Sequence, residues 1–345
     1  MKNNNQKIFE YLEKERITYI QNFNISNRSW LKAGGIIRTY ITPENADQVA
    51  KILNFLDKER CNFYTLGNIS NTIIRDGMIL TPIINLSKIN SIKIINNDKD
   101  LKIYVDAGVS IPRFANFIIN QEYLGAEGLL GIPGSVGGGI FMNASCYNNA
   151  LTNYITKIFS MNEKGKIIER NKEESNFNWR NSKFQDSKEI ILGANFVFPF
   201  INKLKLDLIK IKSEKIKLHR KNIQESEYPN LGSLFATKNL YSDIKFKSIN
   251  FFLIFMYYKI FSILIKNNFL RNSDIATFRK KINKIYRKHM KIVDDNHFTL
   301  SDKTINCLIN RGSKSSVDAI NLINKLKMII GKKIKLENIV LDKIK

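Results

Sequence analysis

The sequence predicts an α+β protein with more than one domain. Its 345 residues are enough to build two or three domains with their own cores. The hydrophobic fraction of 43% is that of an ordinary globular protein. Short β-branched runs, separated by glycines, alternate irregularly with amphipathic helices, which is not the pattern of a regular βαβ array.

The first predicted elements lie between residues 42 and 105. Thr42-Pro-Glu predicts a helix start, because a capping residue precedes proline and an acid in the first turn. Val49, Ile52, Leu53 and Leu56 then recur at helical spacing. Four apolar runs follow as predicted strands, and Gly67, Gly77 and Gly108 lie between or just after them: 62–66, 78–84, 91–95 and 101–105.

The next elements surround a glycine-rich stretch. Ile111, Phe114, Phe117 and Ile118 predict a second amphipathic helix. Beyond the glycines, residues 154–161 and 166–169 predict a hairpin around Gly165, and residues 189–198 predict another strand.

The last third of the chain has a weaker pattern. A basic helix is expected over residues 205–221, with four apolar side chains toward a core: Leu208, Ile211, Ile216 and Leu218. Residues 228–235 predict a turn and a strand of small residues. The remaining predicted elements are a helix carrying Ile275, Phe278, Ile282 and Ile285, a strand over 304–310, a Ser315-capped helix and a strand over 334–341.

The stretch Gly125–Asn143, GAEGLLGIPGSVGGGIFMN, contains seven of the 17 glycines. Such density indicates backbone that turns sharply or approaches a ligand closely. The stretch has no Lys or Arg, so an anion there would bind to main-chain N–H groups. A flexible linker is the alternative, but the interleaved Leu, Ile, Val and Phe residues argue against it.

Three other short motifs could carry chemistry. Leu66-Gly-Asn-Ile-Ser-Asn71 predicts a strand that ends in a turn able to contact phosphate oxygens, although ordinary turns look similar. Arg180 lies between aromatic residues and could stabilise a carboxylate or enolate, or simply cover Trp179 on the surface. Ser233 follows Gly232, and no nearby histidine suggests a triad, so a hydrogen-bonding serine is the simpler interpretation.

Composition restricts the partners and the compartment. The net charge of +24 suits polyanions or phosphorylated ligands, but lysines are spread along the whole chain, which favours compositional drift. The apolar run over residues 251–265 carries Lys259 and is too short for a membrane span, so a buried or interfacial helix is expected. The N-terminus has no secretory pattern, and the three scattered cysteines predict neither disulfides nor a metal site.

In their order along the chain, these motifs resemble the UDP-N-acetylenolpyruvoylglucosamine reductase family. The resemblance covers roughly residues 27–236 and 298–340, and its most specific part is GIPGSVGG at residues 131–138. It implies a two-lobed FAD-binding domain of the vanillyl-alcohol-oxidase (PCMH) type at 1–200, with lobes of about 1–88 and 89–200. An α+β substrate domain at 201–330 and a terminal strand at 331–345 that returns to the active site would follow.

The resemblance implies FAD as the cofactor and NADPH as the co-substrate. The residues that would bind FAD lie in the turn and in the glycine-rich loop: Gly67, Asn68, Ser70, Asn71, Gly131, Pro133, Gly134, Ser135, Gly137, Gly138 and Asn143. The implied reaction adds a hydride and a proton to the enolpyruvyl group of a UDP-linked amino sugar, giving UDP-N-acetylmuramate for peptidoglycan. Arg180 would stabilise the developing charge and Ser233 would donate the proton.

Three positions depart from the family pattern. Ile339 stands at the position of the family's catalytic glutamate, and Glu337 matches only the preceding acid, about 6.6 Å away on a strand. Ile69 replaces a glycine, and Trp179 replaces a tyrosine. We take Glu337 as the third catalytic candidate.

We expect a cytoplasmic monomer without a nucleic-acid partner. The alternatives are another FAD-linked oxidoreductase on the same scaffold, a copy with weak or no activity, and a basic nucleic-acid-binding protein.

Overall fold

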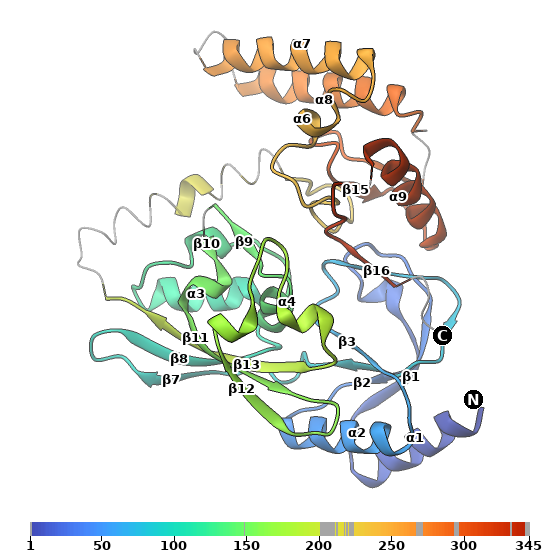
Figure 1. The fold of residues 1–345 in the computed structure, drawn as a ribbon, viewed down its shortest axis with the longest axis vertical. Helices are drawn as coiled ribbons and strands as arrows, with labels where there is room; N and C mark the ends of the chain where they lie inside the picture. Colours follow the sequence, from blue (N-terminus) through green and yellow to red (C-terminus); the bar gives the residue numbers. More distant parts are fainter. Residues whose placement is uncertain are drawn as a thin grey trace.

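The computed structural model describes residues 2–147, 149–200, 211, 213–216, 218, 220, 224–266, 272–292, 297–331 and 333–341. Residues up to 200 form two lobes of sheet and helix that lie side by side, and the C-terminal third forms another unit beyond them (Figure 1). Mixed sheets and helices confirm the predicted α+β class.

The first lobe contains a sheet with the strand order β1-β2-β6-β3, and β5 also pairs with β2. Strand β1 is antiparallel to β2, whereas the other pairs are parallel. Its elements are α1 (Lys2–Lys14), β1 (Tyr19–Asn24), β2 (Ile36–Ile41), α2 (Ala46–Lys58), β3 (Tyr64–Leu66), β4 (Thr72–Ile74), β5 (Met78–Ile79) and β6 (Ile83–Asn85).

The second lobe contains an antiparallel sheet with the order β12-β11-β13-β8-β7. The predicted hairpin is confirmed, because β11 pairs antiparallel with β12. The elements are β7 (Ile92–Asn96), β8 (Leu101–Asp106), α3 (Ile111–Asn120), α4 (Val136–Phe141), β9 (Ser145–Cys146), β10 (Asn149–Ala150), β11 (Ile155–Met161), β12 (Ile167–Asn171) and β13 (Ile190–Phe198).

The C-terminal unit is mainly helical and sends its last strand back to the first lobe. Strand β16 runs parallel to β4, with Ile339 opposite Thr72. The elements are α6 (Leu240–Ile244), α7 (Ile249–Lys266), α8 (Asn272–His289), β14 (Phe298–Leu300), β15 (Leu308–Asn310), α9 (Val317–Ile330) and β16 (Ile339–Leu341). Short 3-10 helices lie at Ile25–Asn27, Glu127–Leu129, Leu151–Tyr154, Glu173–Ser175 and Lys183–Asp186.

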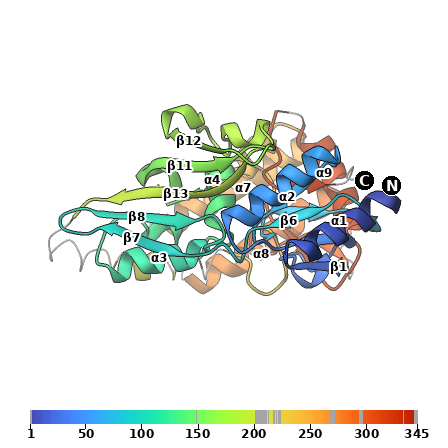
Figure 2. The same cartoon turned by 90° about the horizontal axis from the view of Figure 1, so that it is seen from below.

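Buried side chains join these parts. One cluster combines residues of α2, such as Val49 and Ile52, with residues of both sheets, such as Ile84 and Val105. Figure 2 shows α2 running across the region where the two lobes meet. The core of the C-terminal unit includes Leu31, Ala33 and Ile73 from the first lobe. The predicted domain limits therefore stay a prediction, because the lobes and the C-terminal unit share buried side chains.

A carboxylate of the first lobe starts a helix of the C-terminal unit. Asp76 Oδ1 accepts hydrogen bonds from the backbone N–H of Ser316, 2.8 Å away, and from the Ser316 hydroxyl, 2.9 Å away. Ser315 also donates its hydroxyl proton to Asp76. The predicted cap is off by one residue, because Ser316 occupies the capping position. The Val317 N–H nevertheless donates to Ser315 Oγ, 3.3 Å away, as well as to Asp76 Oδ2, 3.4 Å away.

Several predicted boundaries are also wrong. Helix α2 begins at Ala46, because Asn45 accepts a hydrogen bond from Gln48 N and caps it in place of Thr42. The predicted strand at 78–84 is two strands, and Pro82, which has no N–H to donate, lies between them. Residues 228–235 form isolated bridges with Ile309 and Leu336 rather than a strand.

The predicted basic helix at 205–221 lies mostly outside the described residues, and Leu208 is among those not described. Ile216 is buried as expected. Ile211 and Leu218 are 53% and 62% exposed, so their predicted place in a core is wrong.

Candidate active site

The turn after β3 and the glycine-rich loop lie against each other. The Ser70 hydroxyl donates a hydrogen bond to the Pro133 carbonyl oxygen, 3.1 Å away. A Cβ atom on Gly67 would lie 2.5 Å from Ser135 Oγ, closer than real Cβ atoms approach. The structure thus brings together two motifs that are more than 60 residues apart in sequence. Glycine at position 67 is what permits the contact.

The rest of the glycine-rich loop packs closely onto the second lobe. Ser135 Oγ caps α4 by accepting a hydrogen bond from the Gly138 N–H. A Cβ on Gly137 would lie 2.8 Å from the Cβ of Ala107 in the turn after β8. Gly131 and Gly134 have φ angles of 76° and 134°, which side chains other than glycine rarely adopt. This loop is ordered, tightly packed backbone and not a linker.

The turn itself leaves backbone donors unused. Within the described part of the chain, the N–H groups of Asn68, Ile69 and Ser70 donate to no acceptor. Ile69 has a φ of 53° although its side chain is branched at Cβ and buried. Such strain persists only where surrounding structure holds it, and it is typical of ligand-binding turns.

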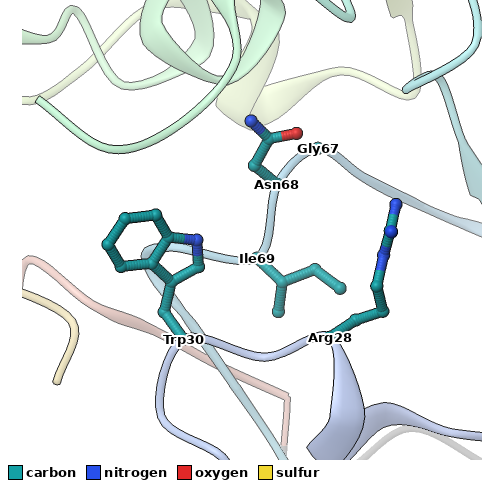
Figure 3. A pocket seen from close by; sticks show the side chains of 5 residues that line it. All are labelled: Arg28, Trp30, Gly67, Asn68 and Ile69. Carbon is teal, nitrogen blue, oxygen red and sulfur yellow. The ribbon is translucent and has the colours of Figure 1, made fainter. Parts of the chain in front are cut away.

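A pocket of about 280 Å³ opens beside this turn. It is lined by Arg28, Trp30, Gly67, Asn68 and Ile69. Figure 3 shows the Trp30 ring on one side of Ile69 and the Arg28 side chain on the other, with the Asn68 amide directed away from Ile69. A guanidinium, an exposed indole and a strained backbone turn form a site that suits a flat, anionic ligand.

Sequence analysis assigned no role to Arg28 or Trp30. The segment that carries them, residues 28–35, lies within the range that the resemblance covers. Nothing in its composition indicates that it lies beside residues 67–69.

Arg180 and Glu337 form an ion pair. The Arg180 Nε and Glu337 Oε1 atoms are 2.8 Å apart, and the two side chains are only 17% and 15% exposed. The Nε–H does not point at the carboxylate as in a hydrogen bond, and no described residue accepts a hydrogen bond from either Nη atom. The guanidinium also lies 5.3 Å from the Trp179 ring centroid. Arg180 therefore keeps donors for another group.

Burial governs the ionisation of Glu337. Desolvation raises the pKa of the Glu337 carboxyl above its ordinary value of 4.5, and the charge of Arg180 offsets only part of this increase. The carboxyl group therefore holds its proton more tightly than a solvated glutamate does.

The end of α4 holds the arginine segment in place. Gln185 Nε2 donates to the carbonyl oxygens of both Arg180 and Phe141, at 3.1 and 2.9 Å. Asn143 Nδ2 donates to the Asn178 carbonyl oxygen at 2.8 Å. Asn143, which the resemblance assigns to FAD, thus uses its side chain to position the arginine segment. Arg180 itself has a φ of 53°, a second strained residue at the site.

Ser233 is brought next to Glu337 by the pairing of two loop segments. The Glu337 N–H donates to the Leu234 carbonyl oxygen, 2.8 Å away. Asn338 Nδ2 lies 3.2 Å from the Ser233 carbonyl oxygen. The Ser233 side chain is exposed, and its hydroxyl bonds to no described residue. Ile339 of β16 instead pairs with Thr72 of β4, so it is Glu337 that reaches Arg180.

Sequence analysis also missed Arg220. This residue is 7% exposed, and its Nη2 atom donates to the Gly128 carbonyl oxygen, 3.0 Å away. Its guanidinium lies 5.3 Å from the Tyr147 ring centroid and borders Gly131, where a Cβ would be 3.1 Å from Arg220 Nη1. A buried cation therefore supports the glycine-rich loop, which contains no basic residue of its own.

Comparison with known proteins points in one direction. Residues 37–171 match a family model described as an FAD binding domain. A UDP-N-acetylenolpyruvoylglucosamine reductase of Clostridium novyi is 28% identical over 96% of this chain and 93% of its own length. The protein of the same name from Lactobacillus helveticus is 32% identical over 65% of this chain and 73% of its own length.

A solved structure has the same fold. The crystal structure of UDP-N-acetylenolpyruvylglucosamine reductase from Thermus caldophilus matches 94% of this chain and 98% of its own with a TM-score of 0.65, at 16% sequence identity. This similarity confirms the predicted fold class, an FAD-binding domain followed by a C-terminal α+β unit.

Proposed function

This chain belongs to the UDP-N-acetylenolpyruvoylglucosamine reductase family, and we propose that it reduces UDP-N-acetylglucosamine enolpyruvate to UDP-N-acetylmuramate with FAD and NADPH. The observation that carries this proposal is the buried Arg180–Glu337 pair. It lies where the arginine segment, the Ser233 loop and the terminal strand converge.

The described residues fit FAD. The unused N–H groups of Asn68, Ile69 and Ser70 provide hydrogen-bond donors for a pyrophosphate, and Gly67 lets the turn approach Ser135. The loop from Gly131 to Gly138 lies against the same turn. When bound, FAD would carry a hydride from NADPH to the methylene carbon of the enolpyruvyl group.

Arg180 would bind the carboxylate of the enolpyruvyl group. Its Nη atoms bond to no described residue, and its position is fixed through Gln185. Hydride addition leaves negative charge on the carbon next to this carboxylate, and a fixed guanidinium in a site of low water content stabilises that charge. The ion pair with Glu337 would keep Arg180 oriented, in place of an acid at position 339.

Ser233 would donate the proton that completes the reduction. Its hydroxyl is exposed and bonds to no residue that the structure describes, and its backbone is tied to the segment of Glu337 and Asn338. A carbanionic intermediate is basic enough to take a proton from a serine without a histidine.

We also propose that the protein is a cytoplasmic monomer, that its substrate is a UDP-linked amino sugar and that it has no nucleic-acid partner. The name of its relatives supports the amino-sugar substrate, and the spread of its lysines along the whole chain argues against a nucleic-acid partner.

Two measurements test the proposed function. Purified protein should show the absorption of oxidised FAD, and it should consume NADPH only when the enolpyruvyl nucleotide is present. A protein that takes up no FAD would refute the proposal. Oxidation of NADPH with a different product would favour another FAD-linked oxidoreductase. A flavin-loaded protein that does not turn over would favour the inactive copy that Ile339 suggests.

A further inference from the structure

Helix α7 carries an apolar stripe that nothing in the described chain covers. Figure 1 shows α7 as the outermost helix of the C-terminal unit, with α8 alongside it. The exposed stripe residues are between 43% and 69% accessible and follow a spacing of four and three: Ile249, Leu253, Met256, Ile260 and Ile263. At 100° per residue, these five side chains fall within an arc of about 80°. We call this set the α7 stripe.

The opposite face of α7 is the one that folds the protein. Phe251, Ile254 and Phe255 are each less than 9% exposed and belong to the core of the C-terminal unit. Phe261, nearly two turns further along, stacks on Phe278 of α8. Folding therefore accounts for one side of α7 and leaves the α7 stripe without a structural role.

The segment of the sequence that contains α7 and α8 is strongly basic. Residues 240–292 contain twelve Lys and Arg side chains and two acidic ones. Lys245 Nζ lies 4.8 Å from the ring centroid of Phe246, which is 78% exposed, and Lys259 Nζ lies 5.6 Å from that of Phe255. Lys259 belongs to α7 itself, and Lys245 lies just before the helix. A surface that combines an apolar stripe with flanking cations complements a negatively charged, apolar partner.

We propose that α7 binds peripherally to the surface of an anionic phospholipid bilayer. The α7 stripe would enter the boundary between head groups and acyl chains, and the lysines would contact lipid phosphates. Among the described residues, no helix is long and apolar enough to cross a membrane, so α7 would lie along the surface. This proposal is independent of the proposed reaction.

Charge decides against a second copy of the chain as the partner. The four-three spacing is also that of a helix pairing seam. However, two chains of net charge +24 repel each other, and residues 244–273 contain no acid that could pair with a facing lysine.

The test is co-sedimentation of the full-length, flavin-loaded protein with two kinds of vesicle. One kind contains phosphatidylcholine alone, and the other contains added phosphatidylglycerol. The Leu253→Glu/Ile260→Glu variant places charges in the α7 stripe. The matched control is Ile95→Glu/Ile167→Glu, because these side chains are equally exposed, at 58% each, on the second lobe.

Wild type and control should sediment with the anionic vesicles, and added salt should release them. The stripe variant should show a partition coefficient lower by at least about tenfold, with unchanged flavin content. The proposal would be overturned if wild type stayed in the supernatant or bound both kinds of vesicle equally. It would also be overturned if the stripe variant sedimented as well as wild type. If wild type were a dimer and the stripe variant a monomer, the proposal would also be overturned, and the α7 stripe would be a self-association surface.

Discussion

Asn338 donates a hydrogen bond from Nδ2 to Asn71 Oδ1, 2.7 Å away, across 267 residues of sequence. Asn71 returns a hydrogen bond from its own Nδ2 to the Glu337 carbonyl oxygen, at 3.1 Å. The same Asn338 nitrogen lies within 3.3 Å of the carbonyl oxygens of Leu231 and Ser233. One buried amide thus connects the turn after β3, the segment of Glu337 and the loop of Ser233.

The first prediction concerns this amide. Asn338→Leu should destabilise the protein by about 2 kcal/mol, because it leaves buried acceptors without donors. Asn338→Asp keeps the shape but places a carboxylate against three oxygen acceptors, so it should cost more at neutral pH and recover on acidification. Denaturant unfolding at two pH values measures both effects. Equal losses of unfolding free energy for the two variants at neutral pH would contradict the role of the Asn338 amide as a hydrogen-bond donor.

The second prediction separates the two halves of the reaction. Ser233→Ala removes an exposed hydroxyl that bonds to no described residue, so folding and flavin content should not change. Stopped-flow reduction of the flavin by NADPH should keep its rate, and reoxidation by the enolpyruvyl substrate should slow by at least about a hundredfold. Ser187→Ala, which removes a half-buried hydroxyl outside the site, is the control. A comparable loss in both half-reactions would remove Ser233 from the role of proton donor.

The third prediction follows from the raised pKa of Glu337. The native chain holds this proton more tightly than the unfolded chain does, so the stabilising contribution is complete below the unfolded pKa and is lost as pH rises through the folded pKa. Glu337→Gln removes this titration. The stability of wild type relative to Glu337→Gln should therefore fall as the pH increases above 4.5. Unfolding free energies across this range test the sign, and a rise would refute it.

The fourth prediction concerns the contact between Asp76 and α9. Burial opposes ionisation of this carboxyl, but the hydrogen bonds from Ser315, Ser316 and Val317 outweigh burial and lower its pKa from 3.8. Its contribution is present above the unfolded pKa and is lost as pH falls through the folded pKa. Asp76→Asn should therefore cost about 1 kcal/mol at neutral pH and less in strong acid. Thermal unfolding at both pH values measures the difference. A cost independent of pH would show that the charge does not matter.

Local patterns in the sequence predicted the parts of the structure that depend on near neighbours. The β11–β12 hairpin follows from alternating residues around Gly165, and α2 follows from the spacing of Val49 and Ile52. The glycine-rich loop could be identified because such a density of glycine indicates backbone that turns sharply or approaches a ligand closely. The start of α2 was predicted three residues too early, because Asn45 and not Thr42 forms the capping hydrogen bond.

Contacts between distant segments could not be predicted in this way. Nothing near Asp76 indicates that it caps a helix 240 residues later, and nothing near Arg28 indicates a pocket beside Gly67. Sequence spacing on an ideal strand placed Glu337 too far away to act in place of residue 339. The structure brings Glu337 to Arg180 because the strand begins only at Ile339, so the segment before it follows the Ser233 loop instead.

The pairing of β16 with β4 also orders events during synthesis. Strand β4 and the turn before it leave the ribosome early, yet β16 and Asn338, which complete their hydrogen bonds, follow more than 260 residues later. The nascent first lobe therefore emerges with an open strand edge at the cofactor turn, a state prone to wrong pairing. Flavin uptake should consequently await passage of residue 341 through the ribosomal exit tunnel.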